Sequence, residues 1–356
     1  MAVAPDLLGH AQREFDRALR RDITGLGYTA SPIPVSGASA NDVLIERGTM
    51  RLYHYHPRVD DVYRVPLLLV MATTNRGYIF DLAPGQSLVE HLLDGGFDVF
   101  MLDWHAPRAD ERGLTLSNYI LDFLPAAIAR VAEETGESDI SVAGYCFGGV
   151  LSLLWASLEG RAAGLANLVA FTTPVDFRPL EMFQAWSDKR FFDVDRLVDT
   201  LGNCPGDYLH TAFDMLRPAG RMAANVRLWE NLWNEEYVRS TRMVERWAND
   251  VLPLAGEYFR ETMKKLMWDN RLLDGTMTVA DRAVDLRAIT VPFLHVGAEH
   301  DHIVPRASSA PLMNMIGSAD KESIVLKGGH VSLVGGGNAK KRLWPKLVDW
   351  LGDRST

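Results

Sequence analysis

The stretch AGYCFGG at residues 143–149 constrains the fold more than any other part of the sequence. Residues 139–145 (DISVAGY) are apolar and typical of a buried strand, and residues 149–160 (GVLSLLWASLEG) have the apolar pattern of a helix. One glycine stands two residues before Cys146 and another two residues after it. This spacing predicts a sharp strand-to-helix turn, the nucleophile elbow, which lifts one side chain above the end of a sheet.

A cysteine in an apolar turn has a simpler interpretation as a small buried hydrophobic residue. The neighbouring Gly144, Gly148 and Gly149 favour the nucleophile instead, because a strained elbow needs small residues around it. The other cysteine, Cys204, lies in the turn GNCPGD and is expected to be inert.

Strand and helix patterns alternate along much of the chain. Residues 50–57 are typical of an edge strand, and apolar runs indicate buried strands at 65–74, 97–104 and 289–301. Further strands are expected at 139–145, 165–177 and 322–330. Helical patterns lie between or after them at 86–95, 117–136, 149–160 and 340–351. This alternation predicts an α/β fold, with a mostly parallel sheet covered by helices on both faces.

The length of 356 residues accommodates one large α/β domain with an insertion. We interpret residues 1–45 as an N-terminal helical extension with an amphipathic helix at 5–22, and residues 46–177 and 285–356 as the core. Residues 178–284 have helical patterns without convincing strands and indicate a helical cap subdomain. They contain five of the nine tryptophans, which either pack the cap or also line an apolar route to the elbow: Trp186, Trp229, Trp233, Trp247 and Trp268.

Composition excludes several classes of protein. A formal net charge of −9 gives no basic surface for nucleic acid, and no apolar run is long enough to span a bilayer. With two cysteines, a disulfide framework is not expected, and a reducing, cytoplasmic compartment fits best. We find no metal-ligand spacing and no phosphate-binding glycine loop, so no metal and no cofactor are expected.

Two further residues complete a pattern that activates a nucleophile. Asp301 stands at the end of a predicted strand in GAEHDHIVP, and His330 stands at the end of the last predicted strand in KGGHVSLVGGG. Nucleophile, acid and histidine occur in this order in the α/β-hydrolase fold, and all three residues fall at the carboxyl ends of strands. The sequence therefore predicts Cys146 as nucleophile, His330 as base and Asp301 as the group that orients the base.

Some assignments stay open at this level. Glu299 and Asp176 compete with Asp301 for the role of the acid, and His302 is either a second functional histidine or a packing residue. For the oxyanion hole we expect two backbone N–H groups, one from Phe147 and one from the loop TTNRG (73–77), where we choose Thr74.

These residues resemble a known family, the polyhydroxyalkanoate synthases, over nearly the whole chain from about residue 45. The resemblance rests on the G-x-C-x-G-G box at 144–149 and on TTNRGY (73–78), LDWHAP (102–107), TTPVDF (172–177), DHIVP (301–305) and GGHVSLVGG (328–336). With about 45 residues before the core, the chain looks like the short catalytic subunit of class III, with class IV as the less favoured choice.

The resemblance implies an acyltransferase that polymerises (R)-3-hydroxyacyl-CoA, with 3-hydroxybutyryl-CoA as the expected substrate, through an acyl group on Cys146. Coenzyme A enters only as part of the substrate. It also implies a second, non-homologous synthase subunit, a homodimer, and a place in the cytoplasm at the surface of polymer granules.

Two residues depart from the family pattern. Phe147 is bulkier than the residue usual after the cysteine in the short synthases and is expected to narrow the acyl pocket. Gly77 stands where a proline is common and is expected to loosen one side of the oxyanion hole.

Two other functions remain alternatives. GYCFGG also resembles the elbow of dienelactone hydrolases, so a cysteine hydrolase or thioesterase is one of them, although those chains are shorter and lack a cap of this size. The other is a catalytically silent subunit that binds polymer granules, which an intact set of Cys146, Asp301 and His330 disfavours.

Overall fold

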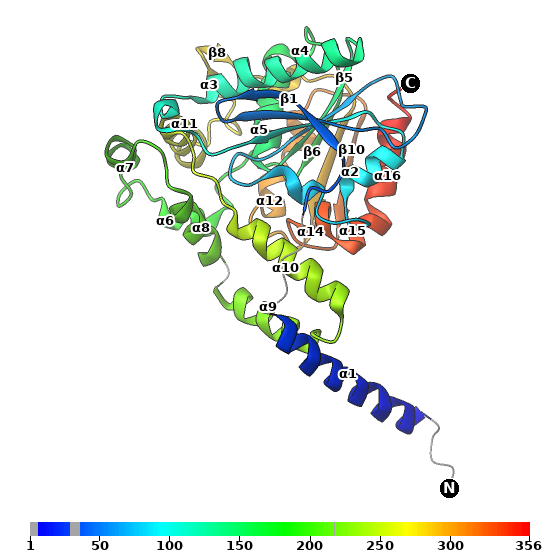
Figure 1. Cartoon of the computed structure of the whole chain (residues 1–356). Coiled ribbons are helices and arrows are strands. Elements are labelled where there is room, and N and C mark those ends of the chain that lie inside the picture. Colours follow the sequence, from blue (N-terminus) through cyan, green and yellow to red (C-terminus); the bar gives the residue numbers. More distant parts are fainter. Residues whose placement is uncertain (1–5, 29–35, 217) are drawn as a thin grey trace.

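An eight-stranded sheet forms the centre of the structure, a computed structural model that describes residues 6–28, 36–216 and 218–356 (Figure 1). The strands, in chain order, are β1 (Asn41–Arg47), β2 (Met50–Tyr55), β3 (Leu67–Val70), β4 (Val99–Trp104), β5 (Ile140–Tyr145), β6 (Leu165–Phe171), β9 (Phe293–Ala298) and β10 (Lys321–Leu326). Their order in the sheet is β1-β2-β4-β3-β5-β6-β9-β10. The pairs β1–β2 and β2–β4 are antiparallel, and the strands from β4 to β10 are parallel.

The central strands carry the core. Every residue of β3, β4, β5 and β9 is buried, which explains why these strands appear in the sequence as continuous apolar runs and not as alternating ones. Burial of each large apolar side chain contributes roughly 1.5–3 kcal/mol to the free energy of unfolding. These four strands therefore contribute a large part of the stability of the sheet.

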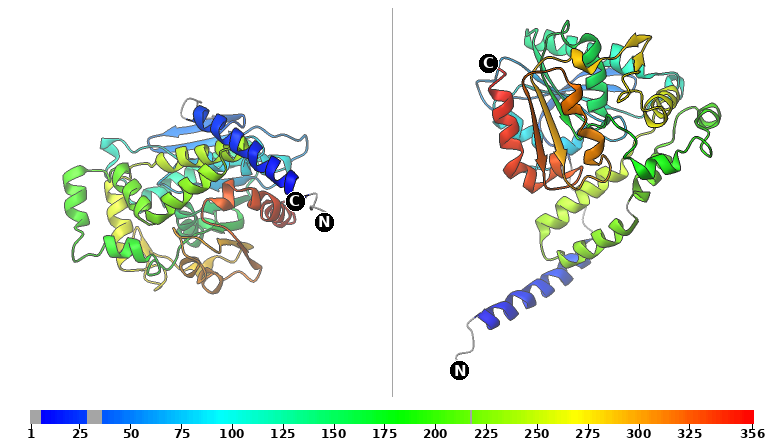
Figure 2. Two further views of the ribbon diagram at one scale, coloured as in Figure 1. Left: turned by 90° about the horizontal axis from the view of Figure 1, so that it is seen from below. Right: turned by 180° about the vertical axis from the view of Figure 1, so that it is seen from behind.

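Helices cover both faces of this sheet, as the right-hand view in Figure 2 shows. The α-helices that accompany the sheet strands along the chain are α2 (Leu88–Asp94), α3 (Leu116–Asn118), α4 (Leu124–Thr135), α5 (Phe147–Trp155), α12 (Arg306–Ser309), α13 (Leu312–Met315), α14 (Ser332–Gly335), α15 (Gly337–Arg342) and α16 (Trp344–Gly352). The predicted α/β fold with a mostly parallel sheet is therefore confirmed.

The edge of the sheet differs from the prediction. The predicted edge strand at 50–57 is the second strand, β2, and the edge is β1, which the sequence did not reveal. Four of the seven residues of β1 are exposed and its burial does not alternate, so the pattern of a strand is masked. Because β1 spans Asn41–Arg47, it crosses the expected boundary at residue 45, and the sheet begins a few residues earlier.

Between β6 and β9 the chain is mainly helical. The helices are α6 (Glu181–Trp186), α7 (Val194–Leu201), α8 (Gly206–Met215), α9 (Pro218–Glu230), α10 (Glu235–Asn249) and α11 (Gly256–Glu261), followed by a π-helical stretch, η5 (Thr262–Trp268). A short hairpin, β7 (Thr278–Val279) and β8 (Arg282–Ala283), also lies in this region, where no strand was expected. The division into core and cap stays an interpretation.

The N-terminal helix α1 (Asp6–Tyr28) extends away from the α/β core and lies beside α9 in both Figure 1 and Figure 2. The Arg17 guanidinium lies 4.9 Å from the centre of the Trp233 ring, so α1 contacts the turn between α9 and α10. Residues 1–5 and 29–35 of the expected extension lie outside the described residues.

Candidate active site

The elbow is present where the glycine spacing predicts it. Cys146 joins the end of β5 to the start of α5 with φ 54° and ψ −120°, a conformation that a residue with a side chain rarely adopts. Such a conformation costs on the order of 1–3 kcal/mol and is maintained only by its surroundings. Here the Cys146 N–H donates to the Phe171 carbonyl at the end of β6 (2.9 Å).

The glycines after the cysteine are required by close contacts. A Cβ atom on Gly148 would overlap the carbonyl oxygens of Val70 and Met71 at the end of β3, and one on Gly149 would overlap the Thr173 side chain. Glycine therefore lets α5 begin directly against the strand ends, which aims the Cys146 side chain out of the sheet.

His330 and Asp301 meet at the same edge of the sheet. His330 Nδ1 lies 2.7 Å from Asp301 Oδ2, and both side chains are almost completely buried. The other carboxylate oxygen accepts the N–H groups of Ile303 (2.9 Å) and Val304 (2.8 Å). Because a carboxylate only accepts, Nδ1 carries the proton and Nε2 is left to face the nucleophile.

The surroundings keep the proton affinity of His330 high. Burial alone would lower the pKa of His330, but the charge of Asp301, the neighbouring Cys146 and hydrogen bonds to both raise this pKa well above its usual value. The Tyr145 ring, 5.0 Å away between centres, packs against the imidazole and fixes its orientation. The arrangement therefore stabilises an imidazolium, the form that results when His330 takes a proton from a thiol.

The competing acids lie elsewhere. Asp176 forms an ion pair with Arg178 (2.9 Å) and accepts a hydrogen bond from Asn270 (2.9 Å), and Glu299 is exposed. His302, next to Asp301, is exposed as well, and its function stays open. The structure thus brings Cys146, His330 and Asp301 together, while their catalytic roles stay predictions.

The two expected oxyanion donors lie beside the cysteine. Phe147 is the first residue of α5, and N–H groups in the first turn of a helix have no acceptor within that helix. Thr74 lies in the loop after β3 and lines the same pocket as Cys146. Gly77 is not loose, contrary to expectation, because its N–H donates to the buried Asp103 carboxylate (2.7 Å). A proline there would have no N–H to donate.

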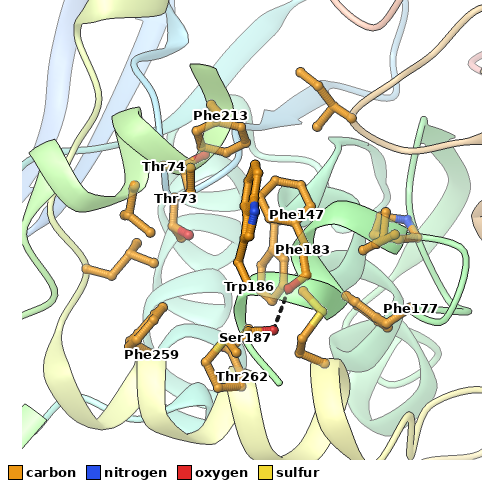
Figure 3. Close-up of a pocket in the computed structure, with 18 of the residues that line it drawn as sticks. Thr73, Thr74, Phe147, Phe177, Phe183, Trp186, Ser187, Phe213, Phe259 and Thr262 are labelled. Carbon is orange, nitrogen blue, oxygen red and sulfur yellow. Dashed lines mark hydrogen bonds between the residues drawn. The ribbon is translucent and has the colours of Figure 1, made fainter. Parts of the chain in front are cut away.

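An apolar pocket opens at Cys146 between the sheet edge and the cap (Figure 3). The rings of Phe147, Phe183 and Trp186 lie together in it, and the wall also includes Phe177, Leu180, Phe192, Leu209, Phe213, Leu254, Phe259, Met263, Met267, Ile303 and Val304. None of the lining residues is acidic or basic. Of the five cap tryptophans, Trp186 is the one among these lining residues.

One buried residue of the pocket was missed by the sequence analysis. The Tyr258 hydroxyl, from α11, forms a hydrogen bond with the Thr73 hydroxyl (2.9 Å) in the loop that contains Thr74. No local pattern marks this pair, because the two residues are 185 positions apart. Among the described residues, no group of three His, Cys, Asp or Glu side chains is placed to hold a metal ion.

This fold and this elbow, histidine and acid define a protein of the α/β-hydrolase class. The model for the alpha/beta hydrolase fold matches residues 73–336. A thermophilic esterase from Thermogutta terrifontis superposes with a TM-score of 0.51, at 15% identity, over 90% of this chain and 100% of the esterase. At that identity the likeness concerns the fold alone.

Within this class, the chain belongs to the family of the poly(3-hydroxyalkanoate) polymerase subunit PhaC. The model for the poly-beta-hydroxybutyrate polymerase (PhaC) N-terminus matches residues 36–92. PhaC of Allochromatium vinosum is 32% identical over 356 residues, 99% of both chains. PhaC of Haloferax mediterranei is 31% identical over 328 residues, which are 92% of this chain but 66% of that longer relative.

Proposed function

We propose that this chain polymerises (R)-3-hydroxyacyl-CoA into polyhydroxyalkanoate through an acyl group on Cys146 and releases coenzyme A. Membership of the PhaC family supports the polymerase activity. The single observation that carries the chemistry is Cys146 on a strained elbow, beside the buried His330–Asp301 pair and at an uncharged apolar pocket. Such a pocket suits an acyl or polyester chain, whereas the phosphates of coenzyme A belong outside it.

In the first half of the cycle, His330 takes the proton of Cys146 and the sulfur attacks the thioester carbonyl. The negative oxygen is held by the N–H groups of Phe147 and Thr74. When the tetrahedral intermediate collapses, the bond from carbon to the coenzyme A sulfur breaks, and His330 returns its proton to that sulfur. The Asp301 carboxylate stabilises the imidazolium in between.

In the second half, a 3-hydroxyl group replaces the thiol as the attacking group. His330 takes the hydroxyl proton, the hydroxyl oxygen attacks the acyl-cysteine carbonyl, and the bond from carbon to the Cys146 sulfur breaks. An ester bond forms and the cysteine regains its proton. A cysteine suits this cycle because the first half exchanges one thioester for another, so that acylation of Cys146 is nearly balanced in free energy.

Chain growth has to be faster than hydrolysis. The apolar wall that α6, α8 and α11 place around Cys146 disfavours water near the acyl-cysteine. This wall favours chain growth over hydrolysis, in which water must reach the same carbonyl.

We further propose, on the family resemblance, that the chain acts with a second, non-homologous synthase subunit, as a homodimer, at the surface of polymer granules in the cytoplasm. Among the described residues no helix is long and apolar enough to cross a membrane. Co-purification with the second subunit and sedimentation of the pair test this part separately from the chemistry.

The activity is tested with the full chain, alone and together with the second subunit of a short-form synthase. We expect the unmodified protein to convert (R)-3-hydroxybutyryl-CoA into insoluble polyester and to release one coenzyme A for each monomer incorporated. Cys146→Ala should yield neither product. Free 3-hydroxybutyrate without polymer would show a hydrolase. Unchanged polymer accumulation in cells in which Cys146→Ala replaces the unmodified chain would show that the chain is a silent subunit.

Replacement of the nucleophile by its oxygen analogue gives a sharper test of the thiol. We expect Cys146→Ser to fold normally but to lose turnover by about 10²-fold or more, because a hydroxyl is far less ionised beside the same base. The measurement is the initial rate of coenzyme A release, with the thermal midpoint as control. A rate near that of the unmodified protein would contradict the thiolate mechanism.

A further inference from the structure

The loop proposed to complete the oxyanion hole is held by the cap as well as by the core. We call residues 73–77 the oxyanion loop and residues 247–258, which run from the last turn of α10 to the start of α11, the return segment. The Leu252 N–H donates to the Thr74 carbonyl (2.8 Å), and Asn75 forms an isolated antiparallel bridge with Val251. These backbone contacts fix the peptide unit that follows Thr74.

Side chains of the return segment fix the loop on either side of Thr74. The Trp247 indole N–H donates to the Arg76 carbonyl (2.7 Å). The Tyr258 and Thr73 hydroxyl groups form a hydrogen bond (2.9 Å), and both residues are buried. The return segment therefore contacts the oxyanion loop on both sides of Thr74, whose N–H is the expected donor.

The same return segment is also attached to the rest of the cap. Leu254, two residues after the Thr74 contact, forms two backbone hydrogen bonds with Cys204 (2.8 and 3.0 Å) in the connection between α7 and α8. Gly256 packs so closely on Gly202 that a Cβ atom would overlap the Gly202 carbonyl oxygen. The return segment thus connects the oxyanion loop to the rest of the cap.

We infer that Tyr258 is a positioning residue for the oxyanion hole, which acts through Thr73 to hold the Thr74 N–H. The inference rests on the proposed function, in which Thr74 supplies the second donor. A donor helps only when it is held where the negative oxygen develops, and loss of one donor outright costs about 10²–10³-fold in rate. Loss of its support should cost less.

The test compares two reactions of the same cysteine. Acylation by (R)-3-hydroxybutyryl-CoA, followed as the first-turnover release of coenzyme A, develops a negative oxygen. Alkylation by iodoacetamide needs the same sulfur and the same base but develops none. We expect Tyr258→Phe to slow acylation by about tenfold to 100-fold through kcat, with KM nearly unchanged and with alkylation at the unmodified rate.

The chain offers a matched control in Tyr119→Phe. Tyr119 is equally buried, its ring lies 4.3 Å from the Tyr258 ring, and its hydroxyl interacts with Thr49, away from the oxyanion loop. This variant also loses one buried hydroxyl, and we expect its acylation to stay within about twofold of the unmodified rate, a shift of less than about 0.5 kcal/mol.

A second variant reaches the pair from the other side, in case Tyr258→Phe does not fold. Thr73→Val keeps the shape but removes the hydroxyl, and we expect the same loss as for Tyr258→Phe. Thr73→Ser should restore acylation, and the double variant should lose no more than either single one. Normal acylation in Thr73→Val would overturn the inference, because Tyr258 would then act on the substrate directly.

The remaining outcomes separate this inference from the proposed function. Equal losses of acylation and alkylation in Tyr258→Phe would overturn the positioning role, since the defect would lie in Cys146 or His330. Acylation of Cys146 at the normal rate in Tyr258→Phe would overturn the inference and leave the proposed function intact. Acyl transfer in Cys146→Ala would overturn the proposed function itself.

Discussion

The two sides of the candidate site are built in different ways. On one side, Cys146, His330 and Asp301 all follow strands of the central sheet, and their contacts with one another lie within the core. On the other side, the loop that contains Thr74 follows β3 but is held largely by the return segment of the cap. The contact between the base and its acid therefore lies within the core, whereas the oxyanion loop is also held by the cap.

This difference assigns separate tasks to the two regions. The sheet ends hold the strained Cys146 and the buried His330–Asp301 pair through contacts within the core. The cap forms most of the pocket wall and at the same time holds the oxyanion loop, so a change in the cap would alter substrate fit and the oxyanion hole together. Variants on each side should consequently differ in which step they slow.

The largest effect is expected on the core side, from Asp301→Asn. The asparagine cannot supply the negative charge that raises the pKa of His330, and burial then lowers this pKa. We expect acylation and alkylation to fall together, by about 10²–10⁴-fold, because both reactions need the proton transfer from Cys146 to His330. Both rates are measured at pH 7, and a loss of acylation alone would contradict the proposed division between the two sides.

Asp301→Asn should also change how the free energy of unfolding depends on pH. A histidine with a raised pKa stabilises the folded state fully below its unfolded pKa, near 6.5, and loses this contribution as pH rises through the folded value. We therefore expect unmodified protein to be more stable than Asp301→Asn near pH 7 and the difference to shrink under alkaline conditions. Urea unfolding at pH 7 and pH 9 measures it, and a difference that grows with pH would contradict the assignment.

The core side was largely predictable from sequence for a physical reason. A buried parallel strand leaves an apolar run, and the residues that follow such runs meet at one edge of the sheet. This logic predicts Asp301 next to His330, and the structure places the two side chains 2.7 Å apart. It failed where a strand is half exposed and charged, as in β1. It also extended β6 to residue 177, whereas the strand ends before Thr172, whose positive φ no propensity indicates.

The cap side could not be predicted in the same way. Its decisive contacts join Thr73 to Tyr258 and Arg76 to Trp247, and such distant pairs leave no period in the sequence. Tryptophan content did suggest an apolar route, but Trp186 alone of the five lines the pocket among the described residues, while Trp247 serves the oxyanion loop.

An intermediate effect is expected where the core holds the oxyanion loop, at Asp103. Burial raises the pKa of this carboxyl to about 6, although the Arg76 charge and the N–H groups of Trp104 and Gly77 oppose the shift. A carboxyl with a raised pKa binds its proton more tightly in the folded state, so it stabilises the protein at low pH and loses that contribution as pH rises through about 6. Between pH 4.5 and pH 7 the loss amounts to about 2 kcal/mol.

We expect Asp103→Asn to abolish this part of the pH dependence, as measured by urea unfolding at the two pH values. Asp250→Asn is the matched control, because the exposed Asp250 accepts a hydrogen bond from Tyr78 (3.2 Å), next to the oxyanion loop, and its charge adds only a minor part to the raised pKa of Asp103. Its pH dependence should follow that of the unmodified protein. An equal change in the pH dependence of both variants would contradict the assignment of this pH dependence to Asp103.

The smallest effect is expected from the pocket wall, in Phe213→Ala. This ring of α8 packs edge-to-face on Phe183, with 5.7 Å between centres, and it faces the pocket in Figure 3. Its loss widens the pocket without touching Cys146 or the oxyanion loop. We expect kcat/KM for six-carbon over four-carbon acyl-CoA to rise by about threefold to tenfold, while alkylation of Cys146 stays unchanged. Phe191→Ala is the control, since Phe191 is 85% exposed in the same helical region. A changed alkylation rate in Phe213→Ala would mean that the cap also governs the nucleophile, and the separation between the two sides would fail.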